Sequence, residues 1–213
     1  MSSDSYRARM RATYNVFEKK RRPVTRLFLV VCLIFATVTH HSWSPDGPVD
    51  RLFDWCGAAL AVLGVLGRLW STMYVGGRKN KDLITTGPYS LCRNPLYLFS
   101  FIAGLGVCVE FENLILIGLY IVFFYAYYSR VIKSEEGRLE LLFGAKFAAF
   151  KGSTPAFIPN IFRLNLGEFP EISGRPLFKN ALDGSVFLLL VGAAYVIEML
   201  QESGVIPVLW NIP

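Results

Sequence analysis

Long runs of apolar residues constrain this chain more than any other feature of its sequence. They lie at 24–39, 52–75, 96–109, 114–132 and 181–200. A helix needs about 20 apolar residues, within a range of roughly 17 to 25, to cross the hydrocarbon core of a bilayer. The second, fourth and fifth runs reach that length, whereas the first and third need flanking residues. The sequence predicts an all-α, polytopic membrane helical bundle with about five transmembrane helices.

The composition agrees with a membrane protein. Hydrophobic residues make up 53% of the chain and charged residues 18%, whereas soluble domains carry about 25% charged residues. The four cysteines form no Cys-x-x-Cys pair, so we expect neither a zinc site nor a disulfide framework, and no metal.

Basic residues are distributed unevenly between the loops. The segments up to Arg26, from Arg78 to Arg93 and from Arg130 to Lys179 hold 20 of the 22 lysines and arginines. Five spans would place all three segments on one side of the membrane. The positive-inside rule then predicts a cytosolic N-terminus in a multi-pass protein of the bacterial inner membrane or the endoplasmic reticulum. Nucleic-acid binding is an alternative for the basic leader, but orientation and attraction to anionic lipid explain it better.

These features divide the chain into four parts. We expect a basic cytosolic leader at 1–23, a membrane core of four spans and a polar segment at 24–162, a linker at 163–180, and an extra transmembrane helix with its tail at 181–213. The first run lacks a small-x-small site at its end, so it is not interpreted as a cleaved signal peptide. Three roles are open for the last span: packing against the site, mediating oligomerisation or anchoring the tail.

The first polar segment on the predicted cytosolic side runs from Asp82 to Tyr97. Gly87-Pro88 favours a turn, and Pro95 suits the first turn of the next helix. Arg93, Asn94 and Tyr97 would cluster at that helix start and could bind a carboxylate or a polar ligand. The alternative is that Arg93 is an ordinary headgroup anchor.

The second polar segment runs from Ser134 to Phe150. Ser134 is expected to cap a helix with Glu135 and Glu136 in its first turn, where acidic residues complement the helix dipole. The apolar residues that follow recur at helical spacing, so the segment should be amphipathic and lie on or under the membrane. The capping role alone would also explain the glutamate pair.

Together these segments resemble a known family of membrane enzymes. Five motifs carry the resemblance: Gly87-Pro-Tyr89, Arg93-x-Pro95-x-Tyr97, Glu135-Glu136-x-x-Leu139, Phe143-Gly144 and Ile158-Pro159. In this order and spacing they are similar to the isoprenylcysteine carboxyl methyltransferases and the related phospholipid methyltransferases. The resemblance covers about residues 52–162, roughly half of the chain.

The resemblance implies S-adenosyl-L-methionine as the cofactor and a cytosol-facing pocket. Carried over to this chain, the residues implied to bind the cofactor are Lys81, Asp82, Leu83, Ile84, Tyr89, Arg93, Asn94, Pro95, Leu96, Tyr97 and Glu135. Their chemistry suits it: Arg93 can bind its carboxylate, Glu135 its ammonium group, and aromatic faces its sulfonium. Arg130 and Glu136 are the substrate-side candidates. The acceptor would be an isoprenylcysteine-like carboxylate or a lipid.

Two positions depart from the family pattern. Asn94 stands where the family usually has a histidine, so the side chain still forms hydrogen bonds but does not titrate near neutral pH. Val131 stands where the isoprenylcysteine enzymes have a substrate arginine, and Arg130 precedes it. A shift of one residue rotates a side chain by about 100° around a helix.

Two other functions compete with methyl transfer. A membrane reductase of the sterol type, which uses NADPH, has a similar arginine-asparagine stretch. A non-enzymatic scaffold or a transporter is the third hypothesis, although a transporter would be expected to show an inverted repeat. The expected partners are a lipophilic, prenylated or lipid acceptor and membrane lipids, with no nucleic acid; the acceptor, the methylated atom and the oligomeric state are left open.

Overall fold

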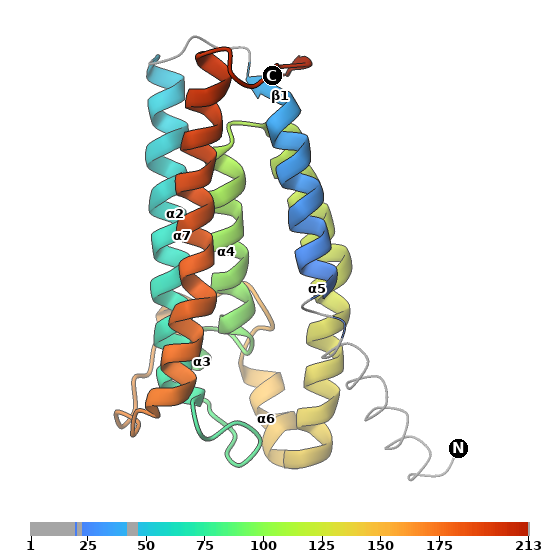
Figure 1. The fold of residues 1–213 in the computed structure, drawn as a ribbon. Helices are drawn as coiled ribbons and strands as arrows, with labels where there is room; N and C mark the ends of the chain where they lie inside the picture. The colour runs from blue at the N-terminus through green and yellow to red at the C-terminus, as the bar shows by residue number, and fades with distance from the viewer. Residues whose placement is uncertain (1–19, 21–22, 42–46, 213) are drawn as a thin grey trace, which may run out of the picture.

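The computed structural model describes residues 20, 23–41 and 47–212, which form a bundle of long helices (Figure 1). Most of the expected leader at 1–23 lies outside the described residues. The elements are a helix at Pro23–Val38, β1 (Thr39–His41), α2 (Pro48–Val75), α3 (Pro88–Leu91), α4 (Pro95–Glu110), α5 (Leu114–Phe143), α6 (Ala145–Ser153), η1 (Ile161–Arg163), α7 (Gly174–Glu202) and β2 (Trp210–Ile212).

Three helices, α2, α5 and α7, are long and apolar enough to cross a membrane, and the apolar helices Pro23–Val38 and α4 are shorter. This confirms the expected all-α polytopic membrane fold. At 1.5 Å per residue, the 30 residues of α5 extend about 45 Å, whereas the hydrocarbon core is about 30 Å thick. Helix α5 is therefore longer than the apolar layer is thick.

α2, α4 and α7 form one tightly packed group. A Cβ at Gly64 of α2 would lie 2.4 Å from the Ala103 backbone nitrogen, and one at Gly106 of α4 would lie 2.4 Å from the Ala61 nitrogen. Glycine at these two positions therefore lets the two backbones approach one another, as small residues do in membrane bundles. α7 packs along both α2 and α4.

The helix Pro23–Val38 lies alongside α5 (Figure 1). The rings of Phe28 and Phe123 stack with centroids 3.8 Å apart. The hydroxyl groups of Thr25 and Tyr128 lie 2.9 Å apart and are hydrogen-bonded. The contact between this helix and α5 is therefore apolar where the two rings stack and polar at the end that holds Thr25 and Tyr128.

The opposite end of the bundle is closed by a short parallel pairing of β1 with β2, in which Thr39 pairs with Trp210. The amide nitrogen of Gln201, at the end of α7, donates hydrogen bonds to the carbonyl oxygens of Ala36, Thr37 and Thr39. The C-terminal end of the helix Pro23–Val38 and the C-terminal segment of the chain are therefore linked at the same end of the bundle.

Two element boundaries differ from those expected. Helix α5 continues without interruption to Phe143, so the expected N-cap at Ser134 is wrong: Ser134 is a buried interior residue. The break comes instead at Gly144, whose φ of 51° is in the left-handed region that favours glycine. Helix α7 begins at Gly174, inside the range 163–180 expected as a linker.

Candidate active site

The turn before α4 begins at a glycine that no other residue could easily replace. Gly87 has a φ of 61°, and a Cβ there would lie 2.4 Å from the Tyr74 ring. Pro88 follows at the start of α3, where its missing N–H costs no hydrogen bond. The turn thereby holds Tyr89 at the base of the bundle.

The chain after α6 runs back along this turn and is hydrogen-bonded to it. The Arg93 backbone nitrogen donates to the Pro155 carbonyl oxygen at 2.8 Å, and the Asn160 nitrogen donates to the Leu91 oxygen at 2.9 Å. The Gly87 backbone nitrogen donates to the Asn165 carbonyl oxygen at 2.7 Å. Two segments that are some 60 to 80 residues apart along the chain therefore form one wall.

Arg93 and Glu136 form a mostly buried ion pair inside this wall. The Arg93 Nε donates to Glu136 Oε1 at 2.9 Å and its Nη2 donates to Oε2 at 3.2 Å. The Arg93 Nη1 donates to the carbonyl oxygens of Lys151 and Thr154. The Asn94 amide nitrogen also donates to Glu136 Oε1. Glu136 therefore ties α5 to the start of α4 and to the chain after α6.

Glu135 projects in a different direction from its neighbour, since adjacent residues on a helix are rotated by about 100°. The Tyr97 hydroxyl donates to Glu135 Oε2 at 2.8 Å, and the Lys79 Nζ lies 3.4 Å from Oε1. The side chains of Lys79 and Glu135 are 50% and 21% exposed. This carboxylate is accessible from a cavity, whereas that of Glu136 is enclosed.

The cavity beside Glu135 has a volume of about 110 Å³. Its lining residues are Val75, Lys79, Asn80, Asp82, Leu83, Ile84, Tyr89, Arg93, Asn94, Pro95, Leu96, Tyr97, Glu135, Leu139 and Phe150. Ten of the eleven residues that the family resemblance implied for the cofactor are among them. The eleventh, Lys81, is exposed and is not one of the lining residues.

Sequence reasoning missed five lining residues. Lys79 and Asn80 lie in the same loop as the expected Asp82, and Val75 is the last residue of α2. Leu139 follows Glu135 by four residues and so faces the same side of α5, a spacing that could have identified it. Phe150 belongs to the apolar pattern of the second polar segment, but the pattern alone did not show which side it would face.

The two substrate-side candidates lie elsewhere. Arg130 is exposed, and its Nη1 donates to the Ala126 carbonyl oxygen at 2.8 Å one turn earlier in α5. Glu136 is buried in the ion pair with Arg93. Neither side chain lines the cavity.

Burial makes two groups near the cavity harder to ionise. The pKa of the Tyr89 hydroxyl is raised, first by desolvation and then by the negative charge of Glu135. Tyr89 therefore stays protonated and can act as a hydrogen-bond donor. Burial also raises the pKa of the Cys92 thiol to about 11, although the Arg93 charge lowers it.

A second, apolar cavity of about 90 Å³ lies among the helix Pro23–Val38, α4, α5 and α7. Its walls include Phe28, Tyr120, Phe124 and Tyr128. Tyr128 contacts Tyr97 of the first cavity edge to face, with ring centroids 5.7 Å apart. A polar cavity and an apolar cavity thus meet at one pair of tyrosines.

Comparison with known proteins identifies the family. The phospholipid methyltransferase family matches residues 54–146, which include Glu135 and most of the cavity lining. The Schizosaccharomyces pombe protein-S-isoprenylcysteine O-methyltransferase is 32% identical over 89 residues, which are 41% of this chain and 38% of that enzyme. This chain belongs to the isoprenylcysteine and phospholipid methyltransferase family of integral membrane proteins.

Two bacterial proteins are similar to this chain over nearly the whole length of both partners in the comparison. The nickel-cobalt-cadmium resistance protein NccN of Alcaligenes xylosoxydans xylosoxydans is 30% identical and covers 92% of this chain and 91% of its own length. The cobalt-zinc-cadmium resistance protein CzcN of Cupriavidus metallidurans is 33% identical, with 92% and 90% covered. No solved structure matches the chain.

Proposed function

We propose that this protein is an S-adenosyl-L-methionine-dependent methyltransferase that acts on a lipophilic acceptor in the membrane. The observation that carries the proposal is the contact between the two cavities. Tyr97 lines the polar cavity, Tyr128 lines the apolar one, and their rings are in contact. A charged, soluble cofactor and a lipophilic acceptor would need a polar site and an apolar site next to each other.

The residues of the polar cavity fit the proposed cofactor. Its ammonium group would pair with the partly exposed Glu135 carboxylate, and its carboxylate with the Lys79 ammonium. Apolar side chains such as Leu83 and Ile84 offer a wall for the adenine ring. The faces of Tyr89 and Tyr97 suit a sulfonium cation. Arg93 was expected to bind the carboxylate of the cofactor. Because Glu136 already neutralises the Arg93 guanidinium, Lys79 is the better candidate for this role.

When bound, the cofactor supplies an activated methyl group. Methyl transfer is an in-line displacement, so the contribution of the protein is alignment of the partners and exclusion of water. The Glu135–Tyr97 hydrogen bond fixes the Tyr97 ring between the cavities, and the T-shaped contact with Tyr128 supports it from the apolar side. The Arg93–Glu136 ion pair holds the wall formed by the chain after α6.

The acceptor would enter the apolar cavity from the bilayer. This cavity is lined by residues of the helix Pro23–Val38, α4, α5 and α7, and its walls are largely apolar and aromatic. The basic residues around α3 and the end of α5 support a cytosolic location of the polar cavity. A cofactor from the cytosol and an acceptor from the membrane would then approach from different sides.

The test is methyl transfer in native membranes. Membranes containing the wild-type protein are incubated with cofactor labelled in its methyl group, and label is counted in the organic extract. We expect a labelled product with the wild type and with Glu140→Gln, whose side chain is exposed on the same helix, and none with Glu135→Gln. Equal label in the Glu135→Gln membranes would refute the assignment of the site.

The two bacterial relatives that match nearly the whole chain favour a physiological role in metal resistance. Both are named as resistance proteins for cobalt and cadmium among other metals, and each is similar over 92% of this chain. We infer that methylation of a membrane component contributes to tolerance of such metals. A host strain lacking the gene should grow less well on cobalt or cadmium, and wild type but not Glu135→Gln should restore growth. Restoration by Glu135→Gln would separate the resistance from the methyltransferase site.

A further inference from the structure

Three large apolar side chains in the segment between α6 and α7 are exposed on the surface of the protein. Ile158, Ile161 and Phe162, here called the apolar patch, are 79%, 67% and 93% exposed. Arg163 is the only charged residue from position 155 to position 167. Large exposed apolar patches mark surfaces that bind a protein or a membrane, so an occupant other than water is expected at this patch.

Phe157 sets the depth of this segment relative to the membrane-spanning helices. Its ring lies against the rings of Phe101 in α4 and Phe124 in α5, with centroid distances of 5.9 and 5.8 Å. Phe124 is near the centre of the apolar run 114–132, about 15 Å from the start of α5. Because the hydrocarbon core is about 30 Å thick, Phe157 reaches into the apolar layer. The chain after α6 therefore turns back into the bundle (Figure 1), and Ile158 follows at the next position.

The backbone of the segment is suited to a membrane environment. Irregular backbone is tolerated at membrane depth only where its polar groups find partners within the protein. Hydrogen bonds to α3 and to the residues on either side of it join Arg93 to Pro155, Asn94 to Ala156, Leu91 to Asn160 and Gly87 to Asn165. Within the patch, the Phe162 nitrogen donates to Asn160 Oδ1 at 3.2 Å. Polar groups of the segment thus bond within the protein, while its large apolar side chains are exposed.

We propose that residues 157–166 are inserted into the membrane leaflet nearest the polar cavity, with the apolar patch in contact with lipid acyl chains. The depth of Phe157 favours lipid over a soluble protein as the occupant, because lipid surrounds the bundle at the level of the apolar runs. Positions 163–166, expected from the sequence to begin a linker, would then belong to the part of the protein within the membrane. The long stem of Arg163 lets its guanidinium reach the headgroups from this position.

The inserted segment would separate lipid from the polar cavity. Its inner side is the wall described above, where the Arg93 Nη1 donates to the Thr154 carbonyl oxygen. Its outer side would be covered by acyl chains. Phe157 also contacts Phe124, which lines the apolar cavity. Lipid would therefore lie beside both proposed binding sites, although the insertion itself does not depend on methyl transfer.

The test places the photo-crosslinking residue p-benzoylphenylalanine in the full chain in place of Phe162, which keeps an aromatic side chain there. Native membranes are irradiated, and the purified protein is analysed by mass spectrometry for phospholipid adducts. We expect a lipid adduct in a yield close to that of the same crosslinker in place of Val122, an exposed residue in the apolar part of α5. Ile161 provides a second site in the patch if the change at Phe162 impairs folding.

The matched control carries the crosslinker in place of Lys81, an exposed residue in the loop between α2 and α3. Its yield of lipid adduct should fall to the level of samples kept in the dark. Circular dichroism checks that each variant keeps its helical content. The proposal is overturned if position 162 gives no more lipid adduct than position 81, or if it crosslinks to a second copy of the chain or to another protein in place of lipid.

Discussion

Glu135 and Glu136 are adjacent in sequence, yet the structure predicts that they contribute very differently to stability. The side chains of Arg93 and Glu136 are 10% and 11% exposed, and they form a bidentate ion pair. Glu136→Gln would leave the Arg93 guanidinium mostly buried without a counter-charge. Removing one partner of a buried pair costs about 3 to 5 kcal/mol. We expect a loss of about 3 kcal/mol, because Arg93 keeps its bonds to two carbonyl oxygens.

Glu135→Gln should change stability much less. The Glu135 ion pair with Lys79 is half exposed on the lysine side, and exposed pairs contribute about 0 to 1 kcal/mol. A glutamine in its place can still accept the hydrogen bond from the Tyr97 hydroxyl. The expected loss is therefore below about 1 kcal/mol.

The assay is equilibrium unfolding in mixed micelles of dodecylmaltoside and increasing SDS, followed by far-UV circular dichroism. Glu140→Gln serves as the control, because the Lys151–Glu140 pair on the same helix is about half exposed, and it should leave the free energy of unfolding unchanged. The reasoning is refuted if Glu135→Gln and Glu136→Gln lower that free energy equally, or if Glu136→Gln changes it no more than the control does.

Two further predictions concern packing and pH. Gly64→Ala should destabilise the bundle by about 1 to 3 kcal/mol, since its Cβ would meet the Ala103 backbone. Gly118→Ala, with open space around it, should be neutral or stabilising in the same unfolding assay, and equal losses in both would contradict the packing argument. For Cys92, a variant with this cysteine alone should react with a thiol reagent about tenfold faster per pH unit up to about pH 11, because burial raises its pKa and the thiolate is the reactive form. A plateau in the rate below pH 9.5 would show that the thiol is not held in its neutral form.

The sequence was sufficient to predict the membrane helices and most of the polar cavity. Apolar run length carries the first prediction, and the motifs around Tyr97 and Glu135 carry the second. The different roles of the two glutamates could not be predicted, because they depend on which side of α5 faces Arg93. The continuation of α5 through Ser134 was missed for a related reason. Serine is a good N-cap residue, but Ser134 does not start a new helix, because the helical turns before it continue without a break.

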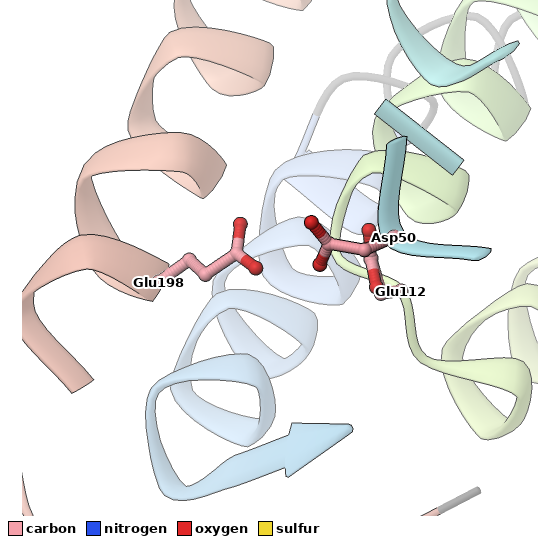
Figure 2. A group of neighbouring side chains, drawn as sticks. All are labelled: Asp50, Glu112 and Glu198. Carbon is pink, nitrogen blue, oxygen red and sulfur yellow. The ribbon is translucent and has the colours of Figure 1, made fainter. Parts of the chain in front are cut away.

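The convergence of three acidic side chains, Asp50, Glu112 and Glu198, whose carboxylate oxygens lie within 4.8 Å of one another (Figure 2), was also beyond sequence reasoning. Asp50, Glu112 and Glu198 are separated by 62 and 86 positions, and each reads alone as an ordinary polar residue at the end of an apolar run. Their convergence depends on how α2 and α7 pack on α4. Likewise, the apolar cavity is formed jointly by the helix Pro23–Val38, α4, α5 and α7, and no local sequence pattern specifies how these four helices come together.

The central claim, that the cavity joining Tyr97 and Glu135 binds S-adenosylmethionine, is tested most directly by calorimetry. S-Adenosylhomocysteine and NADPH are titrated separately into the detergent-purified protein and into Glu135→Gln. The account predicts binding of S-adenosylhomocysteine by the wild type, at least about tenfold weaker binding by the variant after loss of a charge-assisted hydrogen bond, and no heat with NADPH. Binding of NADPH without S-adenosylhomocysteine, or equal affinity in the folded variant, would contradict it.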